Sequence, residues 1–323
     1  MTQPDKTAAK DDRTLIRPLL IAAAVAAILA VTAYLLIVRT RLGQRFDNAA
    51  LVGSLQQSDT SRLHDASFLG HITTKSFAAA LIGMVLIGLA RRRPRLGVTV
   101  AATALVGLLG IDFIKDHVLT RPFLVASDAT RTANTFPSGH TAIAIGGAFA
   151  LVVLSPPLIR GVVAILAGAY SWAVAADVQS AGWHRPSDAI GSVLICFALI
   201  CVAVVVLARF RPRSEGRRLT HVPAYVVLGA VLVFSLSLSI YNAVRVLHAL
   251  RVSADAVTFT HSVLNAAYLF SINLTVAMVV FALISLLVLL GPFDFDAPYA
   301  SRKTLASRPE PPEELAPSTS SAP

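Results

Sequence analysis

The sequence predicts an all-α membrane protein with about eight transmembrane helices. Three observations predict this fold class. Only 14% of the 323 residues are charged, whereas soluble proteins carry about 25% charged residues. Hydrophobic residues make up 55% of the chain and the mean hydropathy is +0.68. These residues are gathered in long stretches without charge. A water-soluble globule, a disordered chain and a disulfide-held scaffold are therefore excluded.

Eight stretches contain no Asp, Glu, Lys or Arg, and each predicts one helix because a transmembrane helix needs about 17–25 apolar residues. The three shortest reach this length if the charged heads of flanking Lys or Arg residues extend to the membrane surface. The first is longer than a signal-peptide core, so we expect a retained helix. The eight stretches are 18–38, 76–90, 96–111, 132–159, 161–176, 189–208, 219–244 and 256–293.

The positions of Lys and Arg predict how these helices are oriented. Basic short loops stay in the cytoplasm, and arginine clusters follow the second and sixth stretches, at 91–95 and 209–218. Both termini of this integral plasma- or cytoplasmic-membrane protein are then cytoplasmic. We interpret most of the net charge of +10 as this orientation signal and expect no nucleic-acid partner. The segments predicted to face outward are 39–75, 112–131, 177–188 and 245–255.

Polar residues form three clusters at the predicted outer ends of the helices. The first contains Lys115 and Arg121, the second is 137–140 with the sequence Pro-Ser-Gly-His, and the third is 184–188 with the sequence His-Arg-Pro-Ser-Asp. Ionisable groups near membrane depth are costly, so they mark functional sites. The three clusters are expected on one face and predict a shared site.

The residue types in these clusters suit phosphate chemistry. Lys115 and Arg121 supply cationic donors for phosphate oxygens. Ser138 and Gly139 precede an apolar run, where the N–H groups of a helix N-terminus form an anion site next to His140.

The third cluster suits nucleophilic catalysis. His184 and Asp188 are four residues apart, a spacing that pairs the imidazole with the carboxylate on a helix or tight turn. The other ring nitrogen is then available as a nucleophile. The pattern predicts phosphoryl transfer through a phosphohistidine, without a metal ion or cofactor.

These motifs resemble the signatures of the type-2 phosphatidic acid phosphatase/haloperoxidase superfamily, in its membrane lipid-phosphatase branch. Pro-Ser-Gly-His at 137–140 is similar to the second signature, Lys115 with Arg121-Pro122 to the first, and the His184…Asp188 pair to the third. The resemblance covers residues 18–208 and implies a six-helix core. It implies that His184 is the nucleophile, Asp188 its orienting partner and His140 the proton donor. The residues implied to hold the phosphoryl group are Lys115, Arg121, Ser138 and Gly139.

Two positions depart from these signatures. Five residues separate Lys115 from Arg121, where the first signature has six. The arginine of the third signature falls on Val178 and its serine on Asp177. We hypothesise that Arg185 or Arg131 replaces the missing arginine.

The sequence thus predicts one main function, two alternative functions and a division of the chain into four parts. The function is metal-independent hydrolysis of a lipid phosphate or diphosphate at the outer face, of the phosphatidic acid, phosphatidylglycerol phosphate or polyprenyl diphosphate class. The alternatives are a lipid-linked phosphotransferase and a non-catalytic lipid-phosphate binding or transport protein. The parts are a cytoplasmic segment at 1–17, the six-helix core at 18–208, two further helices at 209–293 and a disordered cytoplasmic tail at 294–323.

Overall fold

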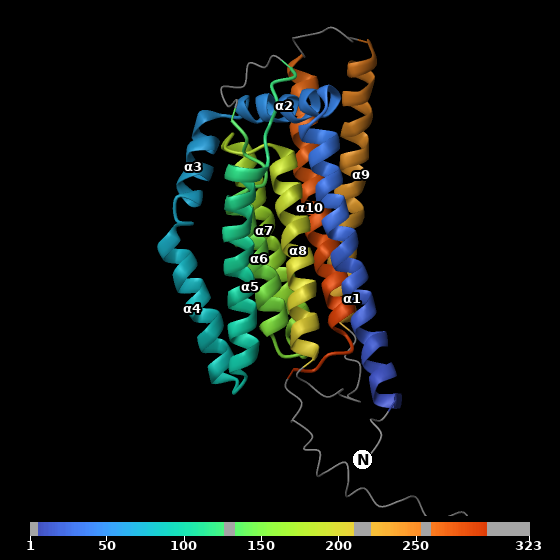
Figure 1. Cartoon of the computed structure of the whole chain (residues 1–323). Helices are drawn as coiled ribbons and strands as arrows, with labels where there is room; N and C mark the ends of the chain where they lie inside the picture. Colours follow the sequence, from blue (N-terminus) through green and yellow to red (C-terminus); the bar gives the residue numbers. More distant parts are fainter. Residues whose placement is uncertain (1–5, 126–132, 210–220, 253–259, 296–323) are drawn as a thin grey trace, which may run out of the picture.

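The computed structural model describes residues 6–125, 133–209, 221–252 and 260–295, and within these ranges the fold is all-α (Figure 1). The second arginine cluster beyond Arg209, Arg131 and the predicted tail from 296 lie outside the described residues. The helices are α1 Lys6–Ala33, η1 Tyr34–Val38, α2 Arg41–Leu55, α3 Asp59–Leu69, α4 Thr74–Ala90, α5 Pro94–Phe113, η2 Ile114–Val118, α6 Gly139–Leu154, α7 Arg160–Ser180, α8 Pro186–Ala208, α9 Val222–Val252 and α10 His261–Leu290.

Each of the eight charge-free stretches contains one long helix: α1, α4, α5, α6, α7, α8, α9 and α10. Six of these are long and apolar enough to cross a membrane alone. A seventh crossing is possible where α3 and α4 join with a bend of 53°. The remaining helix, α6, has 16 residues, about 24 Å at 1.5 Å per residue. Most of α6 is buried among other helices, so it need not match the bilayer by itself.

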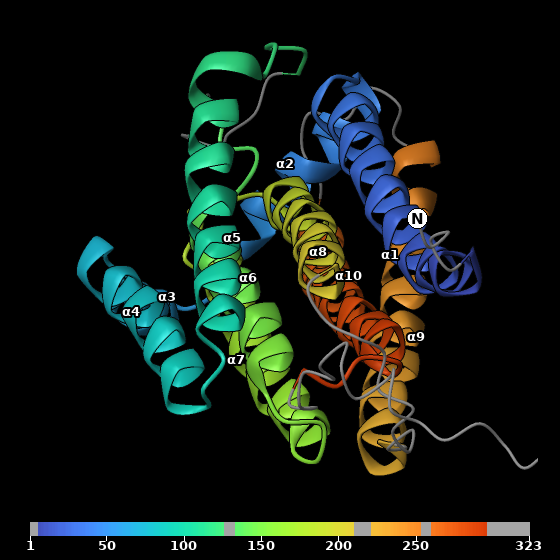
Figure 2. The same cartoon turned by 60° about the horizontal axis from the view of Figure 1, so that its bottom comes forward.

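Successive long helices run in opposite directions, so their ends fall into two groups (Figures 1 and 2). Helix α2 lies across one end of the bundle, which we call the α2 end. The loops before α6 and between α7 and α8 are also at the α2 end. The start of α1, the turn between α4 and α5 and the end of α10 are at the opposite end. The arginine cluster 91–95 is therefore separated from all three polar clusters by the length of the bundle.

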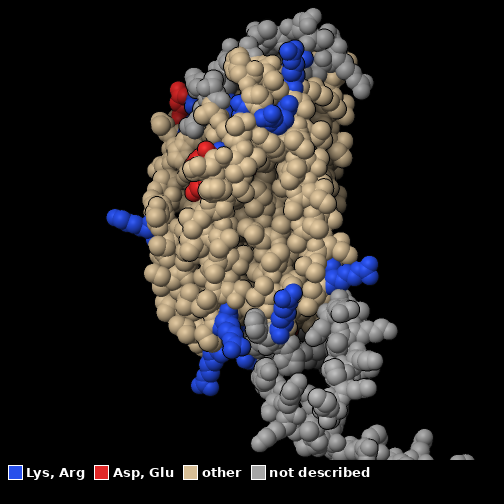
Figure 3. Space-filling view, in the orientation of Figure 1, with Lys and Arg blue, Asp and Glu red and all other residues tan. Residues whose placement is uncertain are grey.

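The outer surface between the two ends is apolar. Large hydrophobic side chains that are at least half exposed occur on several helices, including Ile28, Leu36, Ile82, Val106 and Phe234. Most of the charged side chains visible in Figure 3 lie toward the ends of the bundle. An apolar surface of this extent requires a lipid environment. The protein is therefore an integral membrane protein.

Helix α10 contacts helices from both the first and the last part of the chain. It packs against α2, α7, α8 and α9, and its Leu283 and Leu286 are fully buried in the main core. The last two helices thus share one core with the first six. At the α2 end, Gly53 lets α2 cross closely over α10, because a side chain there would run into the Leu264 backbone.

Candidate active site

The three polar clusters meet at the α2 end. Lys115 lies in η2, which continues α5, and Ser138 is the residue before the first turn of α6. His184 and Arg185 form the short connection between α7 and α8, and Asp188 lies in the first turn of α8. The fold therefore places on one end residues that are up to 73 positions apart in the chain.

His184 and Asp188 form the pair that their spacing predicts. The Nδ1 atom of His184 is 3.2 Å from Oδ2 of Asp188, whose side chain is fully buried. The same oxygen accepts hydrogen bonds from the Thr135 hydroxyl at 2.6 Å and the Arg185 backbone N–H at 2.9 Å. With a carboxylate as its partner, Nδ1 is assigned the proton. Nε2 of His184 is then the nitrogen with a free lone pair.

A glycine turn fixes the position of His184. Gly182 has a φ of +70° at the end of α7, a left-handed conformation that suits glycine because it lacks a Cβ. The turn directs the backbone N–H groups of Trp183 and His184 toward the Val178 carbonyl oxygen, each at 3.0 Å. The imidazole is thus held by its backbone as well as by Asp188.

His140 faces His184 from the start of α6. Their ring centroids are 6.2 Å apart, and the ring of Trp183 packs edge-on against His140 at 5.3 Å. Ser138 caps α6, because its hydroxyl oxygen accepts the Thr141 backbone N–H at 3.3 Å. A phosphoryl group bonded to Nε2 of His184 would lie beside His140 and near the N-terminus of α6.

Hydrogen bonds lock the start of α6 to α8. The Ser138 backbone N–H donates to the Asp188 carbonyl oxygen at 3.1 Å, and the Ser192 hydroxyl donates to the Ser138 carbonyl oxygen at 2.7 Å. Phe136, joined to Pro137 by a cis peptide bond, packs against Gly191 of α8. The two histidines therefore belong to segments that are rigidly connected.

Lys115 reaches the start of α6 through Asp112. Its Nζ is 2.8 Å from Oδ1 of Asp112, and a Cβ built on Gly139 would lie 3.5 Å from that oxygen. The Asn134 side chain donates to the carbonyl oxygens of Lys115 at 3.1 Å and Leu119 at 3.0 Å. Lys115 is thus beside Gly139, although the lysine-to-arginine spacing is one residue short.

Arg121 is held in the interior by Asp47 of α2. Its Nη1 is 2.9 Å from Oδ2 of Asp47, and the two side chains are 4% and 0% exposed. Asp47 also accepts the Ser187 backbone N–H at 3.1 Å and the Ser187 hydroxyl at 2.7 Å. Burial raises the pKa of Asp47, and the Arg121 guanidinium and these hydrogen bonds act in the opposite direction. Within the described part of the chain, Nη2 of Arg121 is buried without a hydrogen-bond partner, so this N–H group can serve a ligand.

Arg185 is held by Asn48, the residue of α2 that follows Asp47. Its Nε donates to the Asn48 side-chain oxygen at 3.1 Å, and Nη1 is 3.5 Å from the Thr135 hydroxyl. Arg185 is 3% exposed. Val178, at the position of the missing signature arginine, is fully buried in an apolar cluster with Leu69, Ala144 and Val174. Arg185 is therefore next to the Asp188 network and Val178 supplies no donor.

The sequence motifs did not indicate that residues of α2 contribute to the candidate site. Asp47 and Asn48 hold the two arginines, and Gln44 binds the segment around Arg121 by accepting the Leu124 N–H at 3.3 Å and donating to the Pro122 carbonyl at 2.6 Å. These residues precede the first motif by more than 60 positions and belong to no recognised signature. The available signal was an adjacent Asp-Asn pair directly before the apolar run Ala49–Val52.

In the comparison with protein families, residues 95–212 match the PAP2 superfamily. The comparisons with curated proteins and with solved structures found no match. The matched range runs from α5 to just beyond α8 and contains all three polar clusters. It contains neither α2 nor the helices α9 and α10. The chain therefore contains a region, residues 95–212, that is similar to the PAP2 superfamily.

Proposed function

We propose that the protein hydrolyses a phosphate or diphosphate ester of a membrane lipid, with His184 as the nucleophile. The match to the PAP2 superfamily supports a phosphoric ester hydrolase, and the long apolar helices support a substrate from the bilayer. The observation that carries the proposal is the contact between buried Asp188 and His184, with the ring of His140 at 6.2 Å.

In the first step, Nε2 of His184 attacks phosphorus and the bond from phosphorus to the leaving oxygen breaks. His140 donates a proton to that oxygen, which leaves as the lipid alcohol or, from a diphosphate, as the lipid monophosphate. Asp188 stabilises the cationic imidazole through Nδ1–H. In the second step, His140 removes a proton from water, the water oxygen attacks phosphorus, and the P–N bond breaks to release phosphate.

The phosphoryl oxygens are held by the cationic and N–H groups around the two histidines. Lys115, Arg121 and the start of α6 at Ser138 and Gly139 would provide donors for the charge that develops in the transition state. We propose Arg185 as the replacement for the arginine missing at Val178. Arg185→Ala is then expected to lower kcat by about a hundred- to a thousandfold, the usual cost of one such donor. Full turnover of Arg185→Ala would refute this replacement, and a loss of turnover in Arg131→Ala instead would assign the role to Arg131.

The proposed site faces the extracytoplasmic side, with both termini in the cytoplasm. The basic cluster 91–95 is at the end opposite the site, and basic short loops remain cytoplasmic. The phosphate would then be removed at the outer surface while the hydrocarbon part of the lipid stays in the bilayer.

The replacement of the signature arginine by Val178 favours one second candidate, a non-catalytic lipid-phosphate binding or transport protein. Such a protein would bind lipid phosphates but release no phosphate. The phosphotransferase alternative predicts that the phosphoryl group appears on an added sugar or lipid acceptor rather than as inorganic phosphate.

The test is a phosphate-release assay of the purified protein in detergent with phosphatidic acid, phosphatidylglycerol phosphate and polyprenyl diphosphates. We expect release from at least one lipid, loss of release in His184→Ala and no loss on addition of a chelator. His248→Ala is the matched control, because His248 is an exposed residue of α9. The proposal fails if His184→Ala retains turnover or if the wild-type protein binds these lipids without releasing phosphate.

A further inference from the structure

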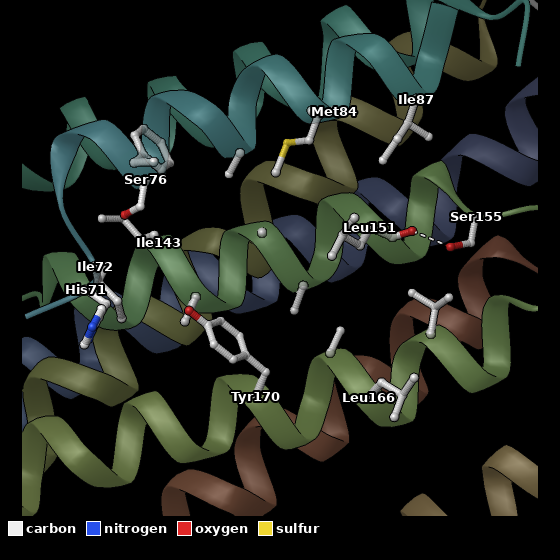
Figure 4. Close-up of a pocket in the computed structure, with 18 of the residues that line it drawn as sticks. His71, Ile72, Ser76, Met84, Ile87, Ile143, Leu151, Ser155, Leu166 and Tyr170 are labelled. Atoms are coloured by element: carbon white, nitrogen blue, oxygen red, sulfur yellow. Dashed lines mark hydrogen bonds between the residues drawn. The ribbon is translucent and has the colours of Figure 1, made fainter. Parts of the chain in front are cut away.

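An apolar groove runs between α4, α6 and α7 (Figure 4). Its volume is about 660 Å³, within the range of small-molecule sites. Met84 and Ile87 of α4 and Leu166 and Tyr170 of α7 point toward the α6 side chains Ile143 and Leu151. The Ser155 hydroxyl at one end already donates to the Leu151 carbonyl oxygen at 2.6 Å. The walls therefore suit a hydrocarbon rather than a polar ligand.

We propose that this groove binds a hydrocarbon chain of the substrate lipid while its phosphate lies between His140 and His184. The inference rests on the function proposed above and assigns the position of the lipid chain. One face of α6 connects the two places. His140 is followed at helical spacing by Ile143, Gly147 and Leu151, all of which line the groove, and residues at i, i+3, i+7 and i+11 share one helix face.

A small apolar cluster connects the groove with the two site histidines, His140 and His184. It contains Val178 and Ala144, with Ile72 and Trp183 packed against it. Ala144 and Ile72 also line the groove, and Trp183 contacts the ring of His140 at 5.3 Å. Valine at the signature-arginine position therefore extends an apolar wall toward His140. The donors Arg121 and Arg185 are held instead on the α2 side.

The groove is open from the side, where the bilayer would be. Its lining residues Ile87, Leu151, Leu166 and Tyr170 are 39% to 66% exposed. From Ile143 to Ser155 the α6 wall is about 18 Å long at 1.5 Å per residue. One leaflet supplies about half of a hydrocarbon core roughly 30 Å thick, so the groove matches the length of one leaflet's chains. A lipid chain can enter it without leaving the bilayer.

A second apolar groove of about 1010 Å³ lies between α1, α8, α9 and α10. Arg17 is at its rim, and α1 begins at the end opposite the site. Its described lining includes neither histidine and no member of the cluster around Val178. This second groove is therefore the alternative location against which the proposal is tested.

Two glycines allow the groove to be filled without a clash. A Cβ built on Gly83 of α4 or Gly147 of α6 meets no atom within 4 Å, and both residues line the groove. Gly147→Leu and Gly83→Leu should each lower kcat/KM for dioleoyl phosphatidic acid about tenfold, because the leucine side chain occupies space in which the lipid chain would otherwise bury its methylene groups. The short-chain, water-soluble dihexanoyl phosphatidic acid should be hydrolysed at the wild-type rate. Gly229→Leu on α9 is the matched control, since its Cβ also meets open space.

A binding measurement separates this proposal from the proposed function. Phosphatidic acid with a photoreactive group in its acyl chain is crosslinked to the wild-type protein and to Gly147→Leu, and the labelled peptides are identified. We expect labelling of α4, α6 and α7 that is reduced in Gly147→Leu. Labelling confined to α1, α8, α9 and α10, or equal loss of activity on both chain lengths, would overturn the groove assignment. Absence of hydrolysis by the wild-type protein with labelled groove helices would overturn the proposed function and leave a lipid-binding groove.

Discussion

Asp47 links Arg121 to the segment that carries the His184–Asp188 pair. It contacts Arg121 directly and binds Ser187, whose hydroxyl is 3.4 Å from Oδ1 of Asp188. A buried ion pair adds little stability compared with apolar packing, but removal of one partner leaves an uncompensated buried charge. Asp47 is therefore a positioning residue for Arg121 rather than a group that touches the substrate.

Replacement of Asp47 tests this role. Asp47→Ala should lower the free energy of unfolding by about 3–5 kcal/mol, because the Arg121 charge stays buried without a partner. Asp47→Asn should destabilise the protein less, since the amide keeps hydrogen-bonding capacity, but should still lower kcat. The measurements are thermal unfolding in detergent and phosphate release. Asp59→Ala removes an exposed ion pair on α3 and should change neither quantity. If Asp47→Ala leaves the free energy of unfolding unchanged, the Asp47–Arg121 ion pair does not stabilise the fold.

At the residue scale, the sequence was informative where short motifs carry the chemistry. The four-residue spacing predicted the His184–Asp188 contact, and the three-residue spacing of Asp112 and Lys115 agrees with their ion pair. The partners of Arg121 and Arg185 could not be predicted in this way. They come from α2, more than 70 and 130 positions away, and only the tertiary fold brings them together.

At the element scale, α2 depends on α10 for its position. The two helices cross at Gly53, where a Cβ would meet the carbonyl group of Leu264 and lie 3.1 Å from Cβ of Tyr268. Helix α10 thus supports the element that carries Asp47 and Asn48. This gives the last helices, which lie outside the PAP2 match, a role in building the site.

Gly53→Ala should therefore displace α2 and disturb both arginines. We expect a loss of about 1–3 kcal/mol in the free energy of unfolding, the usual cost of overpacking, together with reduced phosphate release. Gly229→Ala on α9 adds the same methyl group in open space and should have no effect. If Gly53→Ala behaves like this control in both measurements, α10 does not position the site through α2.

The long helices were predictable because charge is excluded from membrane depth. Each of the eight charge-free stretches contains a helix, including 132–159, of which α6 occupies only 16 residues. The segment 51–74 is harder to interpret from the sequence, since its mixed polarity fits an interfacial helix and an ordinary loop equally well. In the structure it contains the end of α2 and all of α3. Their orientation is set by packing on α10 and α7, which leaves no simple periodic signal.

At the scale of the whole molecule, the polar site lies at one end of the bundle and the basic turn 91–95 at the other. The proposed orientation predicts that the site end is accessible from outside the cell. Cysteine introduced at Asp59, which is 92% exposed near the α2 end, should react with a membrane-impermeant maleimide on intact cells. Cysteine at Arg92, in the turn between α4 and α5, should react only after the cells are opened. The reverse pattern would place the site in the cytoplasm.

The proposed mechanism requires that His184 becomes phosphorylated during turnover. The most direct measurement is to quench the enzyme with its lipid phosphate substrate labelled on phosphorus and to identify the labelled residue by peptide mapping. We predict an acid-labile, alkali-stable phosphoryl group on the peptide that contains His184. This label is absent from His184→Ala. It accumulates in His140→Ala if loss of the group that takes the proton from water slows the second step more than the first. Turnover with no label on His184, or a label on another residue, would contradict the proposed mechanism.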